Sequence, residues 1–168
     1  MSWRIIKTIL ILPGTALVYV PLLIHYFSGG WPFGGSVGGT LAWIVAAALA
    51  VPAIALAATT MRLFIHQGEG TPAPWDPPTK FVVSGPYSYV RNPMLTSVII
   101  LIIAEGIAFN STALLGWAVA FYAFNTAYFI ASEEPALAQR FGRTYLSYKS
   151  AVPRWLPNRW PYEAPHGD

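Results

Sequence analysis

The sequence has no cysteine, and only 10% of its 168 residues are charged. The absence of cysteine excludes disulfide bonds, thiolate catalysis and cysteine-liganded metal sites. The three histidines, His25, His66 and His166, lack metal-ligand spacing, so no metal site is expected. An ordinary soluble domain has roughly 25% charged residues. The scarcity of charge, together with 55% hydrophobic residues, therefore indicates an integral membrane protein.

Four apolar segments are long enough to cross a bilayer core of about 30 Å, which takes roughly 17 to 25 helical residues. They lie at about Trp3–Phe27, Val37–Ile65, Pro93–Phe109 and Thr112–Ser132, and the third is the shortest. The first is too long for a secretory signal peptide and is not followed by a small-residue cleavage site, so we expect it to remain as a membrane helix. The fold class predicted is all-α integral membrane, with about four transmembrane helices.

The positive charges predict the orientation in the membrane. All ten Lys and Arg residues lie near the N-terminus, from the end of the second apolar segment to the start of the third, or in the tail, whereas residues 28–36 and 110–111 carry no charge. The positive-inside rule then places both termini and the middle segment, with any site formed there, in the cytoplasm. Basic residues beside membrane helices usually meet anionic headgroups, so the expected partner is the lipid membrane and not nucleic acid.

Residues 67–92 are rich in proline and glycine and include the stretch GEGTPAPWDPP. Proline removes a backbone donor and restricts the residue before it, so this segment cannot be helical throughout. Trp75, Phe81, Val82 and Val83 supply apolar anchors that a flexible linker would not need, which predicts an ordered cytoplasmic loop. Residues 1–66 are expected to form an N-terminal two-span region, and residues 67–168 the loop, a helical hairpin and the C-terminal cytoplasmic segment, within one integrated domain.

The tail predicts a C-terminal amphipathic helix that stops before Pro153. Leu137, Phe141, Tyr145 and Tyr148 recur in it at helical spacing. Their apolar face suits a helix lying at the level of the lipid headgroups, or a helix packed on the cytoplasmic loop, and the two can both hold.

The third apolar segment has a well-defined start. Asn92 suits the N-cap, and Pro93 suits the first helical position, where its missing N–H costs nothing. The first free amides, near Met94 and Leu95, then face the loop with the positive end of the helix dipole behind them, an arrangement that suits a carboxylate or a phosphate. Simple capping of a membrane helix is the alternative.

Adjacent carboxylates, Glu133 and Glu134, follow the fourth apolar segment. At a helix C-terminus they would oppose the dipole, so an offsetting cation is expected. The sequence leaves two sources open: a structural ion pair with Arg91, Arg140 or Arg143, or the ammonium group of a bound ligand. A helix N-terminus on one side and carboxylates on the other would suit a zwitterion such as an amino-acid moiety.

Two runs with an apolar hairpin between them, GTPAPWDPPTKFVVSGPYSYVRNPM and EEPALAQRFGRTYLSYKSAVPRWLP, resemble the isoprenylcysteine carboxyl methyltransferase family and its relatives, the phospholipid methyltransferases. The resemblance covers about residues 68–157, over half the chain. It implies an S-adenosylmethionine cofactor held between the cytoplasmic loop, the start of the third span and the end of the fourth.

The family's Arg-His-Pro-x-Tyr motif falls on Arg91, Asn92, Pro93, Met94 and Leu95. Asn92 keeps a hydrogen-bonding side chain in place of His, whereas Leu95 lacks the hydroxyl of Tyr. Further cofactor contacts that the resemblance implies fall on Lys80, Phe81, Val82, Tyr87, Glu133 and Glu134. The charge pattern read from the residues agrees, with helix-start amides for the methionyl carboxylate and Glu133 for its ammonium.

The expected function is an S-adenosylmethionine-dependent methyltransferase that acts on a small lipophilic acceptor dissolved in the membrane. Methyl transfer from a sulfonium is an in-line displacement, so the enzyme mainly aligns donor and acceptor and excludes water. A carboxylate acceptor is already ionised at neutral pH, whereas an ammonium must first lose a proton, so the lack of an evident base favours a carboxylate. An NADPH-dependent sterol-reductase-like enzyme and a non-catalytic membrane interaction protein are the alternatives.

Overall fold

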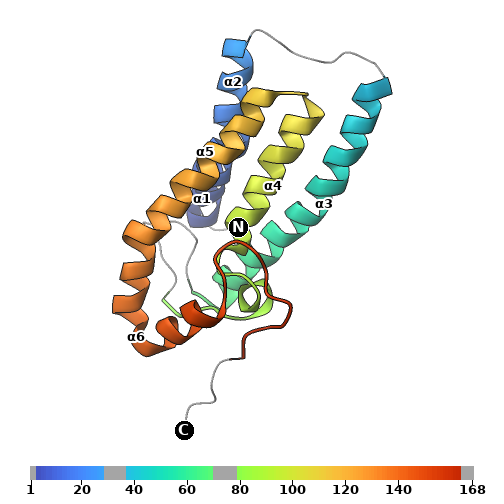
Figure 1. Cartoon of the computed structure of the whole chain (residues 1–168). Coiled ribbons are helices and arrows are strands. Elements are labelled where there is room, and N and C mark those ends of the chain that lie inside the picture. Colours follow the sequence, from blue (N-terminus) through green and yellow to red (C-terminus); the bar gives the residue numbers. More distant parts are fainter. Residues whose placement is uncertain (1–2, 29–36, 70–78, 164–168) are drawn as a thin grey trace.

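The computed structural model describes residues 3–28, 37–69 and 79–163 (Figure 1). Within these ranges every regular element is a helix and no strand occurs, which confirms the predicted all-α fold class. The loop anchor Trp75 lies outside the described residues.

The N-terminal half supplies two long apolar helices. The first consists of α1 (Trp3–Gly14), a π turn η1 (Thr15–Tyr19) and α2 (Val20–Ser28), and its apolar span is Ile6–Phe27. The second is α3 (Val37–His66). Both have the length and hydropathy to cross a membrane, as the sequence predicts.

The C-terminal half begins with a helical hairpin. Helix α4 (Pro93–Ala108) starts at the predicted residue, packs along α3 and turns into α5 (Thr112–Tyr128) (Figure 1). At about 1.5 Å per residue its 16 residues extend for about 24 Å, less than the core of a typical bilayer. Three of the four predicted spans therefore have full spanning length in the described chain, and α4 is a shorter apolar helix.

The hairpin and the N-terminal helix share a small core. It consists of Ala16 from η1, Val98 and Ile102 from α4, and Ala118 from α5. The indole Nε1 of Trp117 donates to the Ala16 carbonyl at 3.0 Å. This side chain supplies a partner for a carbonyl in the widened turn, as irregular helix in a membrane protein requires.

Helix α5 does not end at the two carboxylates. A π turn, η3 (Phe129–Glu133), leads directly into α6 (Glu134–Ala151), so the prediction that Glu133 and Glu134 lie at a helix C-terminus is wrong. The turn precedes Pro135, whose missing N–H would leave a carbonyl unpaired in a regular helix, and a π turn accommodates such a defect. The dipole therefore gives no reason for a cation at this point.

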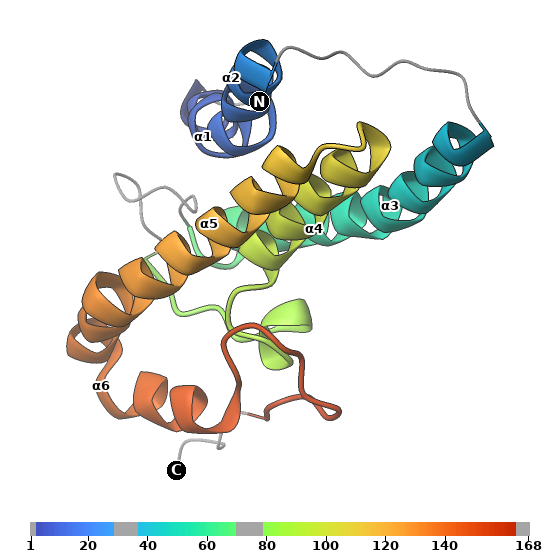
Figure 2. The ribbon, with the colours of Figure 1, turned by 45° about the horizontal axis from the view of Figure 1, so that its top comes forward.

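Helix α6 bends at Gly142, which has φ 55° and ψ −131°, and its second half turns back toward the loop (Figure 2). The left-handed φ is open to glycine because it lacks a Cβ. Beyond the bend Tyr145 and Tyr148 are buried, with Phe81 of the loop packed against them. Of the two environments predicted for the amphipathic face, the structure shows packing on the loop, and the helix stops before Pro153 as predicted.

Candidate functional site

The chain entering α4 is fixed by backbone hydrogen bonds to the C-terminal tail. The Arg91 N–H donates to the Pro153 carbonyl at 2.9 Å. The Tyr89 carbonyl accepts from the Asn158 N–H at 2.8 Å. These pairings hold the residues just before the α4 N-terminus against a segment more than sixty positions away in the sequence.

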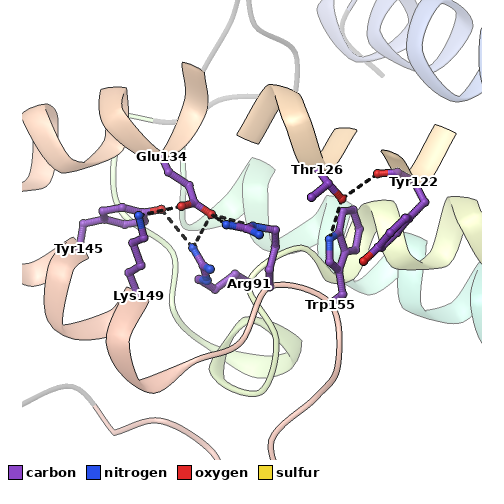
Figure 3. A network of polar contacts seen from close by, with 8 residues as sticks. Arg91, Tyr122, Thr126, Glu134, Tyr145, Lys149 and Trp155 are labelled. Atoms are coloured by element: carbon purple, nitrogen blue, oxygen red, sulfur yellow. Dashed lines mark hydrogen bonds and ion pairs between the residues drawn. The ribbon is translucent and has the colours of Figure 1, made fainter. Parts of the chain in front are cut away.

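Glu134 is the centre of a buried ion-pair cluster (Figure 3). Its side chain is only 6% exposed, and its Oε1 lies 2.8 Å from Arg91 Nη1 and 2.6 Å from Arg154 Nη2. Its Oε2 lies 2.7 Å from Lys149 Nζ. One carboxylate thus joins the start of α4, the end of α6 and the tail. Arg91 is confirmed as one of the expected partners.

Arg91 has donor capacity beyond this ion pair. Its side chain is 11% exposed, and its Nη1 also donates to the Tyr145 hydroxyl at 3.4 Å. Its Nε is buried and has no hydrogen-bond partner within the described chain. A buried donor of this kind carries a desolvation cost unless a ligand or water meets it.

Glu133 differs from its neighbour. It is half-buried, and within the described ranges no cation or hydrogen-bond donor is paired with its carboxylate. Burial raises the pKa of the Tyr87 phenol well above its ordinary value, and the charges of Tyr148 and Glu133 add to the rise. Glu133 therefore lies within electrostatic reach of Tyr87, while the cations nearby are engaged by Glu134.

The N-terminus of α4 has no side-chain cap. Asn92 occupies the N-cap position as predicted, and its side chain makes no capping hydrogen bond. The backbone bond from Thr96 N–H to the Asn92 carbonyl, at 3.0 Å, begins the helical ladder. The earlier amides of Met94 and Leu95 have no place in that ladder, since the first turn of a helix leaves its N–H groups without intrahelical partners.

The predicted loop contacts divide into buried and exposed residues. The Phe81 ring lies 5.2 Å from that of Tyr148, and Val82 is buried. Tyr87 is also buried, and its carbonyl accepts a hydrogen bond from the Tyr148 hydroxyl at 2.6 Å. Lys80, in contrast, forms an exposed ion pair with Glu69 at the start of the loop, and the structure does not bring it into the cluster around Glu134.

Two members of the cluster were not predicted as partners, Lys149 and Arg154. Arg140 and Arg143 were predicted as partners but do not pair with Glu134. The Arg140 guanidinium instead lies 5.2 Å from the centre of the Phe141 ring. The bend at Gly142 accounts for Lys149, because it turns the second half of α6 back toward Glu134, and the tail that follows brings Arg154 to the same carboxylate. An excess of basic residues in the tail was the only sequence signal.

The family comparison covers most of these elements. The model of the phospholipid methyltransferase family matches residues 41–144, more than half of the chain. The chain belongs to the phospholipid methyltransferase family. This confirms the superfamily inferred from the sequence, and with the long apolar helices it indicates a membrane methyltransferase. The match includes Arg91, Glu133 and Glu134, whereas Lys149 and Arg154 follow it. No individual curated protein matches the chain.

Proposed function

We propose that this member of the phospholipid methyltransferase family transfers the methyl group of S-adenosylmethionine to a lipophilic acceptor dissolved in the membrane, and that the acceptor group is a carboxylate. The observation that carries the proposal is the different pairing of two adjacent carboxylates. Glu134 forms ion pairs with three cations, whereas Glu133 forms none within the described chain. A half-buried carboxylate without a counter-charge is suited to a cationic ligand.

The residues present fit the methionyl group of S-adenosylmethionine. Its ammonium requires a carboxylate, which Glu133 offers. Its carboxylate requires N–H donors, which the Met94 and Leu95 amides offer at the positive end of α4. The buried Nε of Arg91 is a further donor of the right charge. We assign Glu134 a positioning role, because its oxygens are already engaged and it holds Arg91 beside the α4 start.

The other contacts that the resemblance implies are supported unequally. Tyr87 has the most support, because it is buried against α6, where its carbonyl accepts from the Tyr148 hydroxyl, and Glu133 is close enough to contribute to the raised pKa of its phenol. Phe81 and Val82 would line the cofactor site with apolar side chains. Asn92 and Pro93 would set the direction in which the chain enters α4. Lys80 has the least support as a cofactor contact, because it would have to break its exposed ion pair with Glu69 to reach the cofactor.

Bound S-adenosylmethionine would supply a methyl group on a sulfonium, so that the S–CH₃ bond breaks as the bond to the acceptor oxygen forms and a neutral thioether leaves. The protein would hold the donor and keep water out. With Glu133 on the ammonium and Glu134 neutralised, neither carboxylate is free to act as a general base. A carboxylate acceptor needs no base, which is why we favour it over an amine.

This assignment also gives the regions and the orientation their roles. Residues 67–168 would form the site, and residues 1–66 would support it in the same domain. A water-soluble cofactor and a membrane-dissolved acceptor can meet only at an interface, and the charge distribution makes that interface the cytoplasmic one. Both termini would then be cytoplasmic.

Calorimetric titration of the purified protein in lipid nanodiscs with S-adenosylmethionine and with NADPH tests the proposal. Binding of S-adenosylmethionine alone is expected. Binding of NADPH alone would indicate a reductase, and binding of neither would indicate a non-catalytic membrane protein. The acceptor class follows from methyl-labelled cofactor, since label released as methanol by alkali marks an ester, whereas label that resists alkali marks an N-methyl product.

A further inference from the structure

The C-terminal tail returns to the membrane-spanning helix α5. The indole Nε1 of Trp155 donates to the Thr126 hydroxyl at 3.0 Å (Figure 3). Its ring lies between those of Tyr122, at 5.0 Å, and Phe129, at 5.9 Å. Thr126 precedes Glu133 by seven residues, about 10 Å of helix at about 1.5 Å per residue. The tail therefore reaches past the level of the ion-pair cluster, toward the middle of the span.

The tip of this tail is held from both sides. Before it, Arg154 Nη2 lies 2.6 Å from Glu134 Oε1. After it, the Asn158 N–H donates to the Tyr89 carbonyl at 2.8 Å, and the Asn158 side-chain amide donates to a carbonyl at the end of α6 at 2.7 Å. Between these anchors Leu156 is 78% exposed. The fold thus fixes a large apolar side chain outward, beside a helix that spans the membrane.

Elsewhere on the same apolar helix, Phe124 of α5 and Ile130 of η3 are exposed, and in a membrane protein such side chains face lipid. Farther along the tail, Trp160 is 73% exposed, and the Arg159 guanidinium lies 5.5 Å from the centre of its ring. Tryptophan concentrates at the membrane–water interface, and juxtamembrane arginine is attracted to anionic headgroups.

We propose that residues 155–160 form a tail anchor that inserts into the leaflet on the loop side of the protein. Leu156 enters the acyl-chain boundary next to α5, and Trp160 and Arg159 lie among the headgroups, with anionic lipid as the partner. Trp155 fixes the depth of the anchor through Thr126. The tail anchor lies outside the matched family region and does not depend on the methyl-transfer proposal.

Because the chain has no cysteine, single labels report on the tail anchor directly. Leu156→Cys carries a nitroxide in vesicles of phosphatidylcholine and phosphatidylglycerol, and Ser150→Cys, an exposed position on α6, is the matched control. Collisions with oxygen, relative to those with a water-soluble nickel chelate, should be several-fold more frequent at position 156 than at position 150. Equal ratios at the two positions would overturn insertion.

A second comparison tests the lipid partner. Arg159→Gln in the Leu156→Cys background should lower the oxygen-to-nickel ratio at position 156 in vesicles that contain phosphatidylglycerol. In pure phosphatidylcholine the same substitution should change it little, because the headgroups carry no net charge there. An equal effect of the substitution in both vesicles, or none in either, would overturn anionic lipid as the partner of Arg159.

Discussion

Replacement of Glu134 by glutamine removes the negative charge from a buried ion-pair cluster. Arg91 and Arg154, only 11% and 21% exposed, would then keep their charges without a counter-ion. Breaking a buried pair by removing one partner costs about 3–5 kcal/mol, because the remaining charge stays buried. Lys149 is 41% exposed and should add little, since water screens it. We expect Glu134→Gln to lower the free energy of unfolding by about 3–5 kcal/mol.

Melting of the purified variant in detergent micelles measures this loss. For a chain of this size 1 kcal/mol shifts the midpoint by about 2–4 °C, so a fall of about 6–20 °C is expected. Glu69→Gln is the matched control, because it breaks an exposed ion pair with Lys80, and it should cost no more than about 1 kcal/mol. Equal midpoints for the two variants would refute the structural role of Glu134.

Three further predictions concern the cofactor site, the hairpin and the topology. Leu95→Tyr should leave the affinity for S-adenosylmethionine within about tenfold, roughly 1.4 kcal/mol, if the site has repacked around leucine, and a larger gain by calorimetry would mark a weakened binder. Gly106→Ala should cost about 1–3 kcal/mol by melting, because its Cβ would meet a leucine side chain of α5 at 2.7 Å, whereas Gly116→Ala has open space and should not destabilise. Impermeant reagents should label Asn110→Cys only from outside and Glu163→Cys only from the cytoplasm, and the reverse pattern would contradict the orientation.

Local sequence signals were enough to predict the helices and the start of α4. Long apolar runs can satisfy their backbone groups in lipid only as helices, so hydropathy predicted the main elements. Asn92-Pro93 predicted the helix start because proline fixes φ and needs no N–H partner. The missing cap bond of Asn92 was beyond the sequence, because it depends on a side-chain rotamer.

The ion-pair cluster was only partly predictable, because it depends on contacts between distant segments. The sequence gives no clear sign that α5 continues through η3 into α6, since Pro135 is compatible either with the start of a new helix or with a π turn in a continuous one. The return of Lys149 and Arg154 to Glu134 depends on the φ of Gly142 and on the tail's backbone bonds to the loop. The charges in the sequence therefore indicated that Glu134 would have cationic partners, but of its three partners only Arg91 was predicted.

The pairing of Glu133 with the ammonium of S-adenosylmethionine is tested most directly by calorimetric titration of Glu133→Gln, with melting of the ligand-free protein alongside. Glutamine keeps the size and one acceptor oxygen but removes the charge. A charged hydrogen bond contributes roughly 1.5–3 kcal/mol, so affinity should fall about ten- to a hundredfold. The ligand-free midpoint should change little, because the cations nearby pair with Glu134. Unchanged affinity, with or without a loss of stability, would contradict the assignment and remove Glu133 from the site.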